Sequence, residues 1–110
     1  GLGANDMLRG IEPGETKNNL EKIIQISLKK NIDIILTGMI APNSHGLKYK
    51  KKFDKIFSDL SKEYKLELIP FLLDGVAMNS ELNLSDGIHP NYKGVVIISK
   101  KLEKIILKKI

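Results

Sequence analysis

The pattern of apolar and polar residues along the chain predicts three helices. In residues 14–30, apolar side chains recur at the three- and four-residue spacing of one helix face, after an acidic, proline-containing start. The clearest stripe lies in residues 49–64, where aromatic and aliphatic residues line one face and lysines and acids fill the other. A third helix is expected after Asn91, whose side chain can cap it. Its apolar stripe consists of Val95, Ile98, Leu102, Ile105 and Ile106.

Two apolar stretches between these helices predict strands. Residues 32–40 are β-branched and nearly continuous in apolar character, which is typical of a strand buried on both faces in a parallel sheet. Residues 66–71 predict a shorter strand, residues 72–78 fit either a brief helix or a loop, and the opening residues are expected to form a turn. Alternating helices and strands indicate an α/β fold. Two strands alone leave backbone groups of a buried sheet unpaired, so we expect part of the sheet to be missing on one side.

Composition fits one small globular domain and excludes cysteine chemistry. The chain has 110 residues, of which 42% are hydrophobic, and it contains no cysteine. It can therefore build an aliphatic core, but it offers no disulfide, thiolate nucleophile or cysteine metal ligand. No apolar stretch approaches the roughly 20 residues that span a bilayer, so we expect no integral membrane segment. With two histidines and no His, Asp and Glu cluster at metal-ligand spacing, we predict neither a metal nor another cofactor.

The positive charge is concentrated in two lysine patches. Lys and Arg number 18 against 13 Asp and Glu, which gives a net charge of +5. One patch contains Lys48, Lys50, Lys51, Lys52 and Lys55, and the other contains Lys100, Lys101, Lys104, Lys108 and Lys109. Such patches can bind nucleic acid or anionic lipid. Arg9 is the only arginine, whereas nucleic-acid readers use arginine for bidentate contacts, so we predict no nucleic-acid partner and interpret the patches as solvated helix faces.

Asp86 and His89 are the first candidates for chemistry. An aspartate three residues before a histidine, in a loop punctuated by Gly87 and Pro90, can accept a hydrogen bond from the imidazole Nδ1–H. That bond fixes the tautomer in which Nε2 is free to act as a base. The same spacing also suits a local turn in which Asp86 bonds to the backbone. Spacing alone therefore leaves both interpretations open.

The second candidate is the opening stretch, residues 1–6, which reads Gly-Leu-Gly-Ala-Asn-Asp. A glycine-rich turn after an apolar strand end would present the Asn5 amide, which is a suitable donor to a developing oxyanion. An ordinary turn explains the same residue types. The stretch does not have the Gly-x-Gly-x-x-Gly spacing of a dinucleotide loop, and no Gly-Lys-Ser/Thr phosphate loop occurs, so nucleotide binding has no support.

Taken together, the two stretches resemble the SGNH, or GDSL-type, hydrolase family. Gly3-Ala4-Asn5-Asp6 is similar to that family's Gly-x-Asn-Asp block, and the segment from Asp86 to His89 is similar to its Asp-x-x-His block. Residues 5–10 and 68–71 further resemble the arylesterase, thioesterase and lysophospholipase branch. The resemblance extends over nearly the whole chain, to about Ile106.

This resemblance implies a flavodoxin-like α/β/α sandwich with strand order 2-1-3-4-5, in which the chain would begin at the end of strand 3. It makes His89 the general base and later the general acid, with Asp86 as its orienting carboxylate. Asn5 and Gly3 would belong to the oxyanion hole. The implied substrate is a small acyl ester or thioester, cleaved through an acyl-enzyme without a cofactor. The resemblance favours a periplasmic or secreted location and leaves the cytoplasm open.

The family's nucleophilic serine has no counterpart in this sequence. Its Gly-Asp-Ser block and its second block, whose glycine N–H helps complete the oxyanion hole, are both absent. No serine lies in a Gly-x-Ser-x-Gly or Gly-Asp-Ser context. Among the serines, Ser27, Ser58, Ser61 and Ser99 fall in predicted helices, Ser44 falls in a loop, and Ser85 adjoins Asp86.

We therefore expect residues 1–110 to be about the C-terminal three-fifths of a single esterase domain of roughly 180 residues. The nucleophilic serine would precede Gly1, and the 110 residues alone would be inactive. The alternative is a non-catalytic or catalytically dead relative that binds anionic surfaces through its lysine patches.

Overall fold

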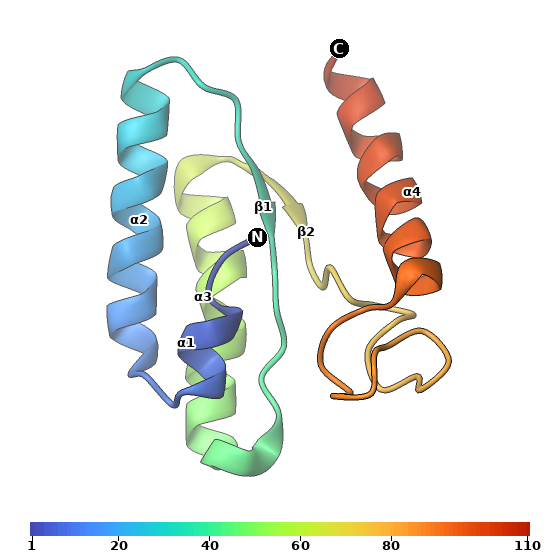
Figure 1. Ribbon diagram of the computed structural model, residues 1–110. Helices are drawn as coiled ribbons and strands as arrows, with labels where there is room; N and C mark the ends of the chain where they lie inside the picture. The colour runs from blue at the N-terminus through green and yellow to red at the C-terminus, as the bar shows by residue number, and fades with distance from the viewer. The chain divides into compact units, whose positions relative to one another are not determined.

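The structure is a computed structural model that describes residues 1–110, and it divides into two compact units (Figure 1). Unit 1 comprises Gly1–Leu72, and unit 2 comprises Leu73–Ile110. Unit 1 holds the sheet and most of the helices, whereas unit 2 consists of consecutive turns followed by one long helix. That the 110 residues belong to a single domain stays a prediction.

Unit 1 alternates helices and strands, as the hydrophobic pattern predicts. Its elements are α1 (Ala4–Leu8), α2 (Pro13–Lys29), β1 (Ile35–Thr37), the short 3-10 helix η1 (Asn43–His45), α3 (Leu47–Tyr64) and β2 (Glu67–Ile69). The two helices predicted at 14–30 and 49–64 are confirmed with ends close to those expected. Figure 1 shows α2 and α3 lying side by side, beside the sheet.

The sheet of unit 1 has two parallel strands. The paired residues are Ile35 with Glu67, Leu36 with Leu68, and Thr37 with Ile69. Two backbone hydrogen bonds follow the last strand pair, from the Gly38 N–H to the Ile69 carbonyl over 2.7 Å and from the Leu72 N–H to the Gly38 carbonyl over 3.1 Å. The parallel arrangement and the helical crossover between the strands confirm the predicted α/β class.

Helix α3 supplies the centre of the core. It contacts α2 and both strands. Its fully buried face consists of Phe53, Ile56, Phe57 and Leu60, each at most 2% exposed. The Phe53 and Phe57 rings meet edge to face, with centroids 5.7 Å apart. These residues cluster with buried side chains from α1, α2 and β1, so one aliphatic and aromatic core holds unit 1 together.

The loop after β1 is fastened to α3 by one carboxylate. Asp54 accepts a hydrogen bond from the Ala41 backbone N–H over 2.7 Å, and it forms an ion pair with Lys50, whose Nζ lies 2.7 Å from Oδ2. Lys50 Nζ also donates to the Ala41 carbonyl over 2.8 Å. The interpretation of the first lysine patch as solvated is therefore wrong for Lys50. This residue belongs to a half-buried network.

Two local predictions were wrong. The strand predicted at 32–40 is confined to Ile35–Thr37, and Ile32 and Ile40 are 52% and 45% exposed. The opening stretch, predicted as a turn, leads into the helix α1. Gly3 caps the N-terminus of this helix with a φ of 109°, and its carbonyl accepts a hydrogen bond from the Met7 N–H over 3.0 Å. Residues 72–78, left open above, form turns.

Unit 2 ends in α4 (Tyr92–Lys109), the third predicted helix. The predicted cap is confirmed, since the Asn91 side chain accepts a hydrogen bond from the Gly94 N–H over 3.1 Å. Lys101 of the second lysine patch is half-buried, and its Nζ donates to the Asp74 carbonyl. No helix of the chain combines the length and apolar character needed to cross a membrane.

Gly38 provides a test of the sheet. A methyl group at this position would lie 2.2 Å from the Pro70 carbonyl oxygen, so the backbone would have to move. We expect Gly38→Ala to lower the free energy of unfolding by about 2 kcal/mol or more, measured by urea or thermal denaturation. Gly14→Ala is the matched control, because nothing lies within 4 Å of its added carbon and its stability should be equal or slightly higher. A Gly38→Ala protein as stable as the wild type would contradict the strand geometry.

Candidate active site

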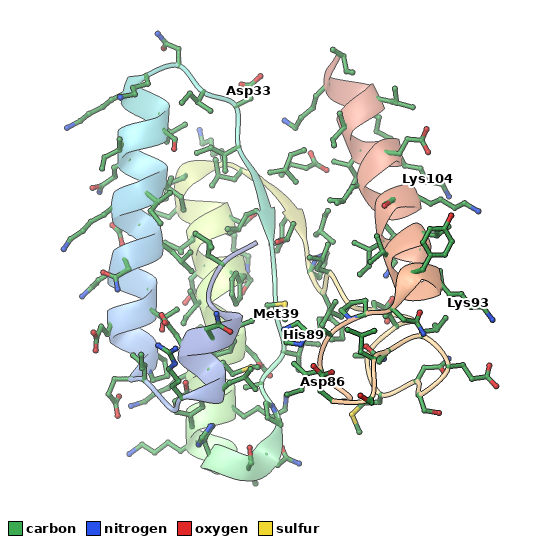
Figure 2. The ribbon with its side chains drawn as sticks, viewed as in Figure 1. Asp33, Met39, Asp86, His89, Lys93 and Lys104 are labelled. Atoms are coloured by element: carbon green, nitrogen blue, oxygen red, sulfur yellow. The ribbon has the colours of Figure 1, made fainter.

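Asp86 and His89 point toward one another in unit 2 (Figure 2). His89 Nδ1 lies 2.6 Å from Asp86 Oδ2. The other carboxylate oxygen, Oδ1, accepts hydrogen bonds from the backbone N–H groups of Ile88 and His89 over 2.9 and 3.0 Å. The two interpretations of the spacing are thus both realised, because one carboxylate closes the turn and also holds the imidazole.

These donors keep the Asp86 carboxylate ionised. They hold the pKa of Asp86 at about 2, below its ordinary 3.8, and the His89 backbone N–H contributes most, followed by the His89 side chain and the Ile88 backbone N–H. An ionised carboxylate can only accept hydrogen bonds, so the imidazole Nδ1 must carry the proton of the bond between them. This leaves Nε2 as the unprotonated nitrogen of a neutral imidazole, and the His89 side chain is 70% exposed.

The backbone of the loop makes this geometry accessible. Gly87 has a φ of 69°, a conformation that glycine adopts without steric cost, and its N–H donates to the Leu84 carbonyl over 2.9 Å. Leu84 N–H in turn donates to the His89 carbonyl over 2.7 Å. The chain therefore folds back on itself between these residues, which brings the carboxylate three positions upstream against the imidazole.

Gly3 and Asn5, the other predicted site residues, lie together at the start of α1 in unit 1. Asn5 is exposed in the first turn of the helix. Both residues line an open groove of about 450 Å³ that also includes Arg9. A carbon added at Gly3 would contact Phe57 and Thr16 at 3.5 Å, and the φ of 109° at Gly3 disfavours any other residue.

Asp6, the last residue of the same block, has a structural partner that sequence inspection did not find. Thr16 Oγ1 donates to Asp6 Oδ2 over 3.0 Å, and Thr16 is only 1% exposed. This bond ties α1 to α2 and so fixes the helix that carries Asn5. No sequence signal identified the pair, because the two residues are joined by tertiary packing between neighbouring helices.

The structure brings the predicted residues together in two pairs. Asp86 meets His89 within unit 2, and Gly3 lies beside Asn5 within unit 1. Their catalytic roles stay predictions. No group of three or more His, Cys, Asp and Glu side chains that could hold a metal ion occurs in the chain.

Comparison with known sequences identifies the family. The sequence model of the GDSL-like lipase/acylhydrolase family matches residues 1–96. The chain belongs to this family. It is 36% identical over 90 residues to thioesterase 1/protease 1/lysophospholipase L1 of Escherichia coli K12, covering 82% of this chain and 43% of the relative. It is 33% identical to esterase TesA of Pseudomonas aeruginosa PAO1, covering 81% of this chain and 44% of the relative.

Solved structures of acylhydrolases confirm the fold class. The chain matches the psychrotrophic esterase EstA from Pseudoalteromonas sp. with a TM-score of 0.90 at 31% identity, over 97% of this chain and 58% of that one. It matches AlinE4, an SGNH-hydrolase family esterase, with a TM-score of 0.75 at 37% identity, over 99% of this chain and 58% of that one. The chain thus spans less than half the length of the curated relatives and about three-fifths of these structures.

The Asp86 interactions predict a pH dependence at acid pH. The pKa of Asp86 is about 2 in the folded protein, and its ordinary value is 3.8. Between these two pH values the unfolded chain therefore binds more protons than the folded protein. The stability that Asp86 contributes should therefore be complete above pH 3.8 and be lost as the pH falls toward 2. Carbon-13 NMR of the Asp86 carboxyl group should show a midpoint near 2.

The control for this titration is His89→Ala. The variant removes the imidazole but keeps both backbone donors, which include the largest contributor, so the Asp86 midpoint should rise and still stay below 3.8. A wild-type midpoint at the ordinary value would show that the loop does not hold the carboxylate as described.

Proposed function

We propose that the protein containing these residues is a serine esterase or thioesterase, with His89 as general base and Asp86 as its orienting carboxylate. The observation that carries this proposal is the 2.6 Å contact between His89 Nδ1 and Asp86 Oδ2 in a chain of the acylhydrolase family. The relatives' names, which include thioesterase, lysophospholipase and arylesterase, support a small acyl ester or thioester as substrate.

In the proposed reaction, a serine hydroxyl attacks the acyl carbonyl carbon while His89 Nε2 takes its proton. The tetrahedral intermediate then collapses, and the imidazolium gives that proton to the departing alcohol or thiol, leaving an acyl-enzyme. Water attacks the acyl group with His89 again as base, which releases the acid and restores the serine. Asp86 stays ionised throughout because its pKa is about 2, and its charge stabilises the imidazolium.

Asn5 and Gly3 are proposed to stabilise the oxyanion of the tetrahedral intermediate. The Asn5 amide would donate to the oxyanion, and Gly3 would let the backbone approach the substrate. Their place on an open groove and the exposure of Asn5 support this role. The fixed geometry of α1 matters here, because a preorganised donor does not have to reorient as charge develops.

The nucleophilic serine is proposed to lie on a segment that precedes Gly1. This chain has no Gly-Asp-Ser or Gly-x-Ser-x-Gly sequence, and it spans only 43% of its thioesterase relative. The solved structure of EstA that it resembles is described as inhibited by monoethylphosphonate. A phosphonate that reacts with serine is therefore a suitable probe for the missing nucleophile.

Site-directed variants of the full-length protein test the two site pairs. In hydrolysis of a short-chain nitrophenyl ester, we expect His89→Ala to lower kcat by about 1,000-fold or more, because the base is lost. Asn5→Ala should cost on the order of 100-fold through the lost oxyanion donor. His45→Ala, the other histidine, and Asn18→Ala, an exposed asparagine of α2, are the matched controls and should keep the wild-type rate. Normal turnover in His89→Ala would reject the proposed base.

A fluorophosphonate probe tests where the nucleophile lies. Treatment of the folded full-length protein should label one serine, and mass spectrometry of the digest should place the label outside residues 1–110, with no labelling after heat denaturation. A label on a serine of this chain would overturn the proposed position. Absence of both labelling and esterase activity would instead support a catalytically dead relative.

A further inference from the structure

Asp86 and His89 lie on a loop of residues 84–89, which we call the dyad loop. Backbone hydrogen bonds close its base. Leu84 N–H donates to the His89 carbonyl over 2.7 Å, and Asn91 N–H donates to the Leu82 carbonyl over 2.9 Å. Between these two bonds, the flanking residues form an antiparallel bridge. The dyad loop is therefore a short hairpin whose two ends can be held from outside.

Asn83 holds the incoming end. Its Nδ2 donates to the backbone carbonyls of Val76 and Asn79, each over 2.8 Å. Val76 is 0% exposed, so one of these bonds reaches a fully buried residue of unit 2. The residue next to the dyad loop is thereby tied to the turns that precede it, and removal of the amide would leave two backbone acceptors without this donor.

Asn91 holds the outgoing end with both atoms of its amide. Oδ1 accepts from the Gly94 N–H over 3.1 Å and so caps α4. Nδ2 donates to the Glu81 carbonyl over 2.8 Å and to the Asn83 carbonyl over 3.4 Å. One side chain thus connects the first turn of a helix of 18 residues to the opposite side of the hairpin.

Gly94 makes this connection sterically possible. A methyl group there would lie 2.3 Å from the Leu82 carbonyl oxygen and 3.0 Å from Val76 Cγ1. The start of α4 is therefore in direct contact with the chain that leads into the dyad loop. Helix, hairpin base and preceding turns form one packed support within unit 2.

We propose that Asn83 and Asn91 are positioning residues that hold the dyad loop so that His89 Nδ1 keeps its bond to Asp86. This inference rests on the proposed function of His89 as a base. The two asparagines flank the loop, and their amides donate only to backbone carbonyls, those of Val76 and Asn79 for Asn83 and those of Glu81 and Asn83 for Asn91. The side chains of His89 and Asp86, together called the dyad, are 70% and 43% exposed, so packing against them does not fix their positions. The ends of the loop must therefore hold the dyad in place. A displacement of the base of about 1 Å can cost on the order of 100-fold in rate.

The test uses Asn91→Ser and Asn83→Ala in the full-length protein. Serine keeps an oxygen that can cap α4 but has no amide to donate across the hairpin, so it separates capping from positioning. Asn79→Ala is the matched control, because the Asn79 side chain only accepts a hydrogen bond from the Glu81 N–H over 3.0 Å, and alanine keeps the backbone carbonyl that accepts from Asn83. We expect kcat for a nitrophenyl ester to fall about 10- to 100-fold in both test variants, with KM little changed, and to stay near wild type in Asn79→Ala.

A second measurement distinguishes positioning from stability. The His89 Nδ1 proton should give a downfield NMR signal in the wild type and in Asn79→Ala, and this signal should weaken or vanish in Asn91→Ser and Asn83→Ala although circular dichroism shows both to be folded. Full kcat and an intact signal in the folded variants would overturn the proposal. Loss of the folded state in Asn91→Ser, which keeps the cap, would also overturn it, because the amide would then be structural.

The two proposals fail differently. If His89→Ala retains activity, His89 is not the base, whereas loss of the Nδ1 signal in Asn91→Ser would still support the holding of the dyad loop. If His89→Ala is inactive and both asparagine variants retain kcat and the signal, the positioning role fails and the base remains.

Discussion

The Asp86 carboxylate is the group on which the candidate site depends, because its two oxygens have different partners. Oδ1 accepts from two backbone N–H groups, which fixes the carboxylate relative to the loop, and Oδ2 accepts from the imidazole. An exposed ion pair held only by charge is weak and mobile, so the backbone bonds are what give this pair a defined geometry. The same bonds keep the pKa of Asp86 at about 2, and the carboxylate therefore remains an acceptor at any pH at which an imidazole is neutral.

Unit 1 uses side-chain carboxylates in a comparable way. Asp54 fastens the loop after β1 to α3, and Asp6 fastens α1 to α2 through Thr16. In open α/β sheets, ligands bind beyond the carboxyl ends of the parallel strands, where loops must be both exposed and ordered. Burial cannot order an exposed loop, but a carboxylate that bonds to a backbone N–H or to a buried hydroxyl can. These two acids thus hold segments of unit 1 in place, and Asp6 directly follows Asn5, the proposed oxyanion donor.

The sequence predicts the long helices well and the short elements poorly, and chain physics explains the difference. A helix of 17 or 18 residues repeats its apolar face several times, so periodicity alone locates α2, α3 and α4. β1 has three residues because only three pair with β2, and an apolar run such as 32–40 contains no signal for where pairing stops. α1 is five residues long, too short for periodicity, and its glycine and asparagine are common in turns.

The candidate site shows the same division between local and tertiary information. The spacing of Asp86 and His89 is local, and it indicates both a contact with the imidazole and a turn closed by backbone bonds, without deciding between them. The partners of Asn83 and Asn91 are backbone carbonyls that only folding brings within reach. The cap formed by Asn91 could be predicted, because asparagine is a preferred N-cap residue. Ser, Thr and Asp would provide an equivalent oxygen acceptor. Asparagine differs from those residues in adding an amide donor on the same side chain, and it is this donor that crosses the hairpin. The choice of asparagine at this position is therefore explained by the loop that carries the dyad, and the helix alone would not require it.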